Sequence, residues 1–141
     1  TTESSLAALI MFDIDHFKRF NDDFGHQKGD EVIKLVAKKV KENLTDKAKV
    51  YRYGGEEFCI TAYFDTINDL VAFAECIRQE IAKLAIRKKQ DVNNKRAISA
   101  SFGLAMLRPF TKSSVLVERA DRALYIAKTH GRNRVEIAPD I

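Results

Sequence analysis

The chain has 141 residues, of which 45% are hydrophobic and 31% are charged, a composition typical of one folded domain that excludes intrinsic disorder. The formal net charge of +4 favours anionic partners. Because no dense run of Lys and Arg with interleaved aromatic residues occurs, we expect nucleotide partners and no nucleic acid.

The sequence predicts a cytoplasmic domain that makes no membrane contact of its own. It contains no apolar segment of about 18 residues and no signal-peptide pattern. The full-length protein can still be attached to a membrane. Cys59 and Cys76 occur without a CxxC motif or a histidine at ligand spacing, so we expect two buried thiols in a reducing compartment.

The first predicted element is a buried strand over residues 6–15 that ends on acidic side chains. Asp13 and Asp15 share one face of this strand, because side chains alternate with a period of two residues. Carboxylates at the end of a buried strand are costly to desolvate unless a cation or hydrogen bonds compensate them. We therefore expect Asp13 to be a metal ligand, whereas Asp15 is first assigned as the N-cap of the next helix.

Two helices are predicted next, separated by a loop over residues 26–29. The first helix buries three rings at helical spacing and ends at Gly25. Its other side carries Lys18 and Asn21, for which a solvated face is the default interpretation. Asp30 is expected to cap the second helix, and His26 to be a loop residue. The three rings are Phe17, Phe20 and Phe24.

A hairpin with strands over residues 50–53 and 58–64 is predicted around the pair Gly54-Gly55. Glycine lets another molecule approach the tip closely. Glu56 and Glu57 follow at once, and carboxylates are ligands that Mg²⁺ prefers. The alternative is a solvent-exposed acidic turn with no ligand.

The remaining elements are read from apolar periodicity. A helix is expected to begin at Asn68 or Asp69, with an apolar stripe that reaches Leu84. Residues 87–96 are expected to form a basic loop. A strand over residues 98–104 closed by Arg108-Pro109, a helix over residues 114–130 and a short strand near Val135 complete the chain.

The predicted element order is βαββαβ with an appended helix and strand, an α+β, ferredoxin-like arrangement. In this arrangement the first strand lies antiparallel to the third, so Asp13 is expected to meet Glu56 and Glu57 at one edge of the sheet. Two Mg²⁺ ions bridged by such carboxylates support phosphoryl transfer. Lys18, Lys128 and Arg132 are then expected to hold triphosphate oxygens.

Six blocks of sequence, in this order and spacing, together resemble the GGDEF family of diguanylate cyclases. The blocks are Phe12-Asp13-Ile14-Asp15-His16-Phe17-Lys18; Asn21-Asp22 with Phe24-Gly25-His26 and Gly29-Asp30; Arg52-Tyr53-Gly54-Gly55-Glu56-Glu57-Phe58; Ala120-Asp121; Ala123-Leu124-Tyr125 with Ala127-Lys128; and Gly131-Arg132-Asn133. The resemblance implies a palm fold related to class III nucleotidyl cyclases. It also implies an enzyme that condenses two GTP molecules into cyclic di-GMP and pyrophosphate, as a transient homodimer that uses two Mg²⁺ ions, which Mn²⁺ can replace.

The resemblance also implies roles for individual residues. Metal ligands would be Asp13, the carbonyl of Ile14, Glu56 and Glu57, with Glu56 also the base for the ribose 3′-hydroxyl. Asn21 and Asp30 would read the guanine edge and His26 would line the same pocket. Phosphate contacts would come from Lys18, Lys128, Arg132 and backbone amides around Phe17, beside the hairpin residues Gly54 and Gly55.

Two departures from the family pattern are visible. Thr45 and Ala48 stand where the family has the Arg and Asp of its product-inhibition site, so we expect no inhibitory site there. The family's usual opening segment is also missing, so residues 1–141 are interpreted as one catalytic domain taken from a longer chain. The alternative function is a catalytically silent, GTP-binding regulatory module.

Overall fold

The computed structural model describes residues 6–88, 91–107 and 112–139. Its helices are α1 (Phe17–Phe24), α2 (His26–Glu42), α3 (Ile67–Ala82) and α4 (Ser113–Thr129). Its strands are β1 (Leu6–Ile14), β2 (Ala48–Gly54), β3 (Glu57–Phe64), β4 (Ala85–Lys88), β5 (Asp91–Ala97), β6 (Ala100–Met106) and β7 (Val135–Ile137). No helix within these ranges is both long and apolar enough to cross a membrane.

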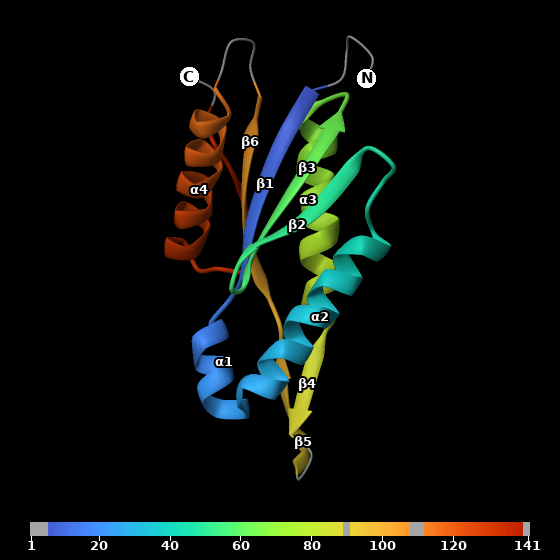
Figure 1. The fold of residues 1–141 in the computed structure, drawn as a ribbon, viewed down its shortest axis with the longest axis vertical. Coiled ribbons are helices and arrows are strands. Elements are labelled where there is room, and N and C mark those ends of the chain that lie inside the picture. Colours follow the sequence, from blue (N-terminus) through green and yellow to red (C-terminus); the bar gives the residue numbers. More distant parts are fainter. Residues whose placement is uncertain (1–5, 89–90, 108–111, 140–141) are drawn as a thin grey trace.

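A five-stranded sheet organises the fold, in the order β2-β3-β1-β6-β7. Strand β1 runs antiparallel to both β3 and β6, and only the β6–β7 pair is parallel. The predicted α+β arrangement is confirmed, because β1 lies between the third strand and the main strand that follows α3 (Figure 1). This order brings the end of β1 against the start of β3.

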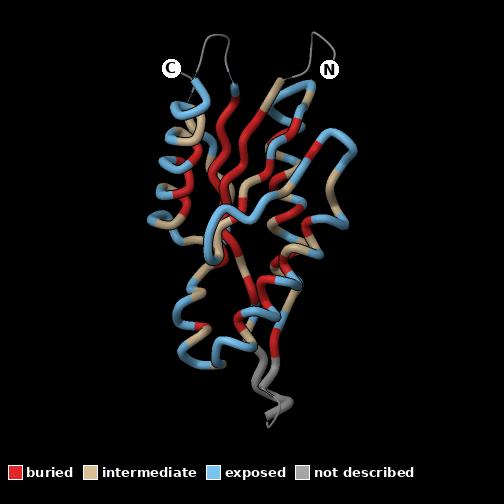
Figure 2. Tube along the Cα trace, viewed as in Figure 1, coloured by how far each residue is buried: buried red, intermediate tan, exposed pale blue. Residues whose placement is uncertain are grey.

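Helices cover the sheet on both faces, so β1 is buried on both sides (Figures 1 and 2). Ile10 and Phe12 join the large core cluster on the side of α1, α2 and α3. Leu9 and Met11 point the other way, into a smaller cluster with α4. The alternation follows the two-residue period of a strand and puts Asp13 on the α4 side.

Helix α4 touches the sheet closely at Gly103 of β6. A Cβ atom added to Gly103 would lie 2.2 Å from the carbonyl oxygen of Ala120 and 2.3 Å from the backbone nitrogen of Leu124. Such distances are far shorter than any van der Waals contact. Only glycine therefore permits this approach of helix and strand.

The predicted loop over residues 26–29 is wrong, since α2 already begins at His26. Gly25 ends α1, donating its N–H to the carbonyl of Asn21, and its own carbonyl accepts from Gly29 in the first turn of α2. With φ at 90°, this one glycine joins both helices without a loop. Asp30 is therefore an exposed residue inside α2 and not its N-cap.

Three further expectations need correction. Helix α3 begins at Ile67, because the Thr66 side chain accepts from the N–H of Asp69 as its cap, and it ends before Leu84. Most of the predicted basic loop is a two-stranded hairpin, β4–β5, which backbone pairing forms without apolar alternation. The sixth strand is Ala100–Met106, while Arg108-Pro109 lies outside the described residues.

The two cysteines also differ from the prediction. Cys59 on β3 is half-buried, whereas Cys76 on α3 is exposed. Burial raises the pKa of the Cys59 thiol to about 11. The expectation of two buried thiols is therefore wrong for Cys76.

Candidate active site

Three strands place polar side chains together on the α4 face of the sheet. Asp13 pairs with Glu57 of β3 and with Ser101 of β6, and residues paired directly across a sheet share one face. Asp13 is only 4% exposed although it is ionisable. The structure thus brings Asp13 beside Glu57, as the strand order requires.

The two oxygens of Asp13 have different surroundings. Oδ2 accepts a hydrogen bond from Nζ of Lys128, which reaches the strand from the last turn of α4. Oδ1 is buried and has no hydrogen-bond partner in the described part of the chain. Burial, only partly offset by Lys128, raises the pKa of Asp13 above its ordinary value. A buried carboxylate oxygen without a partner is costly, and a cation is the ligand that would satisfy it.

Neighbouring carboxylates repel one another around Asp13. Burial followed by the charge of Asp13 raises the pKa of Glu57, with a smaller contribution from Glu56. Asp121 of α4 adds its charge to the same field, and burial raises its own pKa. Sequence reasoning missed Asp121 as a site residue, although its spacing of two helical turns from Lys128 puts both on one face of α4.

The acidic groups fit a magnesium ion in their chemistry. No group of three or more His, Cys, Asp or Glu side chains within residues 6–88, 91–107 and 112–139 is gathered closely enough to hold a metal. Mg²⁺, however, commonly takes only one or two protein carboxylates and completes its shell with water and substrate phosphates. The unpartnered Oδ1 of Asp13 and the facing Glu57 meet that requirement.

The β2–β3 hairpin presents its tip next to these carboxylates. The Arg52 side chain donates from Nε to the Gly55 carbonyl at 2.8 Å, which holds the turn. A Cβ added at Gly54 or Gly55 would meet nothing within 4 Å, so the tip is open to an approaching molecule. Glu56 is half-buried, and its carbonyl accepts from the N–H of Ile14 at the end of β1.

A second group of predicted site residues lies on α1 and α2. The side-chain oxygen of Asn21 is buried without a partner in the described structure and lies against Gly29, where a Cβ would come within 1.8 Å of it. Asp30 follows Gly29 directly and is exposed, as is His26 at the start of α2. Gly29, the residue before Asp30, therefore leaves room for the Asn21 side chain, whose oxygen is an unpaired acceptor.

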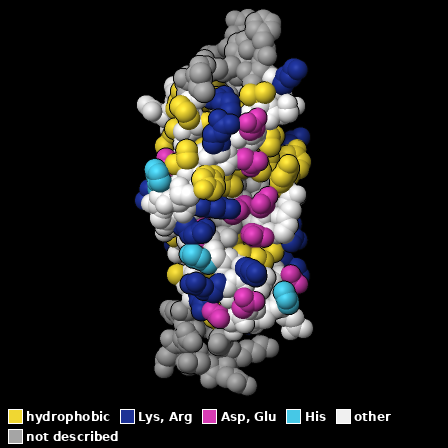
Figure 3. Space-filling view, turned by 90° about the vertical axis from the view of Figure 1, so that its left-hand side faces the viewer, with side chains coloured by type: hydrophobic (Ala, Val, Ile, Leu, Met, Phe, Trp, Pro, Cys, Tyr) yellow, Lys and Arg dark blue, Asp and Glu magenta, His cyan; other side chains and the backbone are white. Residues whose placement is uncertain are grey.

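The predicted phosphate-binding cations come from α1 and from the end of α4. Lys18 is exposed on α1, next to the half-buried Phe17, whereas Lys128 and Arg132 are half-buried at the end of α4. Figure 3 shows Lys and Arg side chains interleaved with Asp and Glu across the middle of one side of the molecule. Such mixed charge suits a ligand that carries both metal and phosphate.

Asp15 is not a helix cap. Its carboxylate accepts from the hydroxyls of Ser99 at 2.7 Å and Ser101 at 2.6 Å, and from the N–H of Asn133 at 3.0 Å. The cap position of α1 is His16 instead, in a left-handed conformation without a side-chain cap. Asp15 thus links the ends of β1, β6 and α4. The sequence around Asp15 does not indicate these distant donors.

Two cavities lie beside α1 and α2, and neither is lined by Asp13, Glu56 or Glu57. One of about 240 Å³ lies behind the start of α1 and is lined by Asp15, His16, Arg19 and Arg96, among others. Another of about 260 Å³ lies between α2 and the β2–β3 pair, with Ile33, Lys34, Arg52 and Phe58 in its lining.

At the positions of the family's inhibitory pair, Thr45 is exposed before β2 and Ala48 is buried at its first residue. Neither side chain carries a charge that would bind an anionic product. The absence of that inhibitory site stays a prediction.

Comparison with known proteins gives concordant matches. A family model described as "Diguanylate cyclase, GGDEF domain" matches residues 1–134. Diguanylate cyclase VdcA of Vibrio cholerae is 41% identical over 128 residues, 91% of this chain and 38% of that protein. The GGDEF domain of DgcB from Caulobacter crescentus, solved in complex with c-di-GMP, has a TM-score of 0.88 at 38% identity and covers 95% of this chain and 78% of that one.

The active GGEEF domain of a diguanylate cyclase from Vibrio cholerae has a TM-score of 0.84 at 36% identity, covering 96% of this chain and 85% of that one. The curated relatives are much longer than this chain, which spans 38% of VdcA and 29% of diguanylate cyclase DosC from Escherichia coli.

Proposed function

Since the chain belongs to the GGDEF family of diguanylate cyclases, we propose that it condenses two GTP molecules into cyclic di-GMP and releases pyrophosphate. One observation carries the proposal. The end of β1 holds a buried carboxylate, Asp13, that has an unpartnered oxygen, an acidic neighbour across the sheet and a lysine from α4. A buried carboxylate with an unpaired oxygen lowers the stability of the core, so stability alone does not account for its presence.

The base of GTP is proposed to bind between α1 and α2. Asp30 accepts from N1–H and the exocyclic amine of guanine, a pattern that adenine does not present, and the free oxygen of Asn21 adds an acceptor beside it. His26 lies at the same end of α2.

The triphosphate is proposed to extend from the base, bound between α1 and α2, to the end of β1. Lys18, Lys128 and Arg132 neutralise its oxygens, with backbone amides near Phe17 and the open glycine tip providing close approach. Mg²⁺, or Mn²⁺ in its place, would be held by Asp13, Glu56, Glu57 and the carbonyl of Ile14, and would supply charge neutralisation at the α-phosphate.

In the proposed step, Glu56 takes the proton of the ribose 3′-hydroxyl of one GTP. The freed oxygen forms a bond to the α-phosphorus of the other GTP, while the bond from that phosphorus to the bridging oxygen breaks and pyrophosphate leaves. The same step in the opposite direction closes the ring. Each chain offers one base pocket, so the two reacting nucleotides come from two copies related by a two-fold axis.

The experiment that tests the proposal is incubation of the purified protein with GTP and Mg²⁺, followed by chromatographic separation of products. Cyclic di-GMP with two equivalents of pyrophosphate is the expected result. Specific activity should rise with protein concentration, because the active species is the homodimer. Bound GTP without any product would instead favour the silent regulatory module and refute the proposal.

Base selection is tested separately with Asp30→Ser. A site that pairs polar groups rejects ligands that leave them unpaired, so the variant should lose part of its preference for GTP over ATP. Asp22→Ser, an exposed acid on α1 with no assigned role, is the matched control. An unchanged preference in the Asp30 variant would remove Asp30 from the base pocket.

A further inference from the structure

The segment that carries Arg132 has an unusual backbone. Gly131, Arg132 and Asn133 all have positive φ, at 121°, 64° and 44°. The left-handed region costs Arg132 about 1–2 kcal/mol, whereas asparagine adopts it more readily, so compensating contacts are needed chiefly at Arg132. These three residues, called the 131–133 turn below, connect α4 to β7.

Contacts from three directions hold the 131–133 turn. The N–H of Arg132 donates to the Ala127 carbonyl within α4, and the N–H of Asn133 donates to Asp15 at the end of β1. On the other side, Nη1 of Arg78 donates to the Asn133 side-chain oxygen at 2.9 Å. Asn133 is therefore fixed through its backbone and its side chain at once, by two elements distant in sequence.

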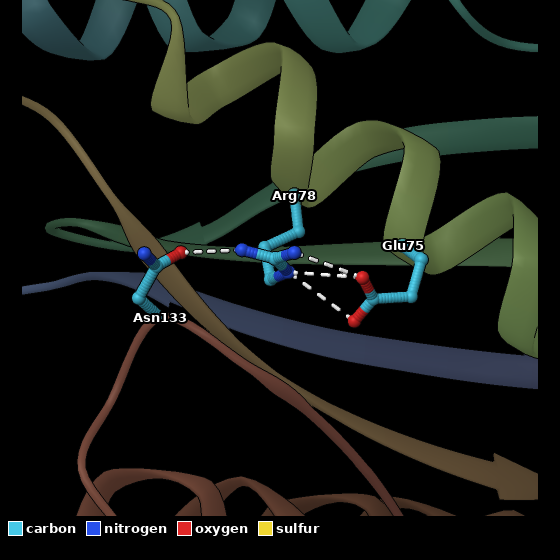
Figure 4. A network of polar contacts seen from close by, with 3 residues as sticks. All are labelled: Glu75, Arg78 and Asn133. Atoms are coloured by element: carbon cyan, nitrogen blue, oxygen red, sulfur yellow. Dashed lines mark hydrogen bonds and ion pairs between the residues drawn. The ribbon is translucent and has the colours of Figure 1, made fainter.

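Arg78 is itself oriented by a carboxylate on its own helix. Its Nε and Nη2 atoms donate to Glu75 at 3.2 and 2.9 Å, a forked ion pair that leaves Nη1 directed at Asn133 (Figure 4). A guanidinium supplies this planar set of donors, whereas a lysine would not. The Glu75–Arg78 pair therefore sets the direction from which α3 reaches the turn.

The residue between these anchors is left free. The guanidinium of Arg132 makes no hydrogen bond or ion pair with the described residues, although it is half-buried. Its backbone N–H, in contrast, donates to the Ala127 carbonyl, and the next residue, Asn133, is held by Asp15 and Arg78. A fixed backbone around an unpaired cation is the arrangement expected of a group kept ready for an anion.

We propose that Arg78 is a positioning residue: by holding Asn133, it keeps the 131–133 turn in the left-handed conformation that presents Arg132 to the phosphates of the nucleotide. This inference rests on the proposed function, because it assumes that Arg132 binds the β- and γ-phosphates. Arg78 lies on α3, and Asn133 is the residue of the turn to which it donates.

The test measures binding rather than turnover. Isothermal titration compares an α,β-methylene analogue of GTP, which cannot release pyrophosphate, with GMP, which lacks the outer phosphates. Arg78→Met keeps the apolar stem and removes the donors. It should weaken binding of the analogue by about tenfold, the usual effect of a lost charge-assisted hydrogen bond, and leave GMP affinity unchanged.

A double-mutant cycle separates positioning from general destabilisation. If Arg78 acts through Arg132, Arg78→Met should have no further effect on analogue affinity once Arg132→Ala is present. Lys83→Met is the matched control, because Lys83 pairs with Glu80 beside the same helix and contacts no part of the turn. That variant should bind both nucleotides like the original protein.

The outcomes separate this inference from the proposed function. Additive losses in the double variant, or equal losses for GMP and the analogue, would overturn the positioning role. The positioning role would also be overturned if the unsubstituted protein bound the analogue no more tightly than it binds GMP. A protein that binds the analogue tightly but makes no cyclic di-GMP would contradict the proposed function alone, and the binding cycle would still decide the role of Arg78.

Discussion

Two adjacent rungs of the sheet, each a set of residues paired across β3, β1 and β6, carry opposite kinds of side chain. The first rung consists of Phe58, Phe12 and Phe102. Phe12 is fully buried, with its ring centroid 5.0 Å from that of Phe58 and 4.7 Å from that of Phe102. The rings of this rung stack on one another, and none of these side chains carries a polar group that needs a partner.

The next rung consists of Glu57, Asp13 and Ser101, on the opposite face. Asp13, at the centre of this rung, is also buried, yet its Oδ1 atom has no partner in the described structure. The like charges of Asp13 and Glu57 lie side by side. Phe12 and Asp13 are consecutive residues of β1, yet the aromatic rung around Phe12 stabilises the fold and the acidic rung around Asp13 destabilises it. The aromatic layer lets the strand tolerate the acidic layer, which under the proposed function would hold the metal.

The largest effect is expected in the aromatic rung. Phe12→Ala removes a buried ring and should lower the free energy of unfolding by about 3–5 kcal/mol. Phe12→Leu, which keeps most of the volume, is the control and should cost clearly less. Urea denaturation followed by circular dichroism measures both. A loss below about 1 kcal/mol for the alanine variant would mean that this rung does not support the sheet.

The acidic rung should respond in the opposite way. Asp13→Asn keeps the volume and should reduce the rate of product formation by about 10² or more. Burial raises the pKa of Asp13, so the folded state binds this proton more tightly than the unfolded state and the ionised group lowers stability above its folded pKa. The variant should therefore be no less stable than the original protein at neutral pH, without added metal. A large loss of melting temperature would contradict this.

A smaller effect is expected at Asp15, which joins Ser101 of the acidic rung to the 131–133 turn. Asp15→Ala leaves the hydroxyl of Ser101, which is 0% exposed, without its acceptor and should cost about 1–3 kcal/mol of stability. Adding Ser101→Ala removes the stranded hydroxyl and should recover part of the loss. Thermal unfolding of the two variants measures the difference, and an equal or greater loss in the double variant would be evidence against this account.

The smallest effect concerns the rung on the other side of Phe12, where Cys59 pairs with Met11. The thiolate is the reactive form, and with a pKa of about 11 Cys59 stays protonated at pH 8. An aromatic disulfide reagent should therefore modify exposed Cys76 quickly and Cys59 slowly. Cys76→Ser should abolish the fast phase, whereas two equal rates would show that the sheet face is open at Cys59.

Strand order was predictable because the apolar runs and their sequence order leave few arrangements. The meeting of β1 and β3 at Asp13 and Glu57 follows from that order alone. The role of Asp15 was not predictable, since its donors lie 84, 86 and 118 residues away and a cap was the nearest local interpretation.

Local sequence patterns failed to predict those elements whose position depends on backbone geometry. The start of α2 at His26 depends on the φ of Gly25, and hairpin β4–β5 depends on backbone pairing in a polar sequence. Asp121 was overlooked although helical spacing puts it with Lys128, because an exposed acid on a helix is usually solvated. The assigned roles of the site residues remain predictions.

The contact of α4 with Gly103 has a consequence for how this sequence can diverge. Backbone atoms at Ala120 and Leu124, rather than side chains, set the distance of the helix from the sheet, and the last turn of that helix carries Lys128. Substitutions along the outer surface of α4 can therefore accumulate without moving the lysine relative to Asp13. A single methyl group at position 103, in contrast, would displace the helix and with it the lysine, so one unsubstituted carbon defines the alignment of two elements.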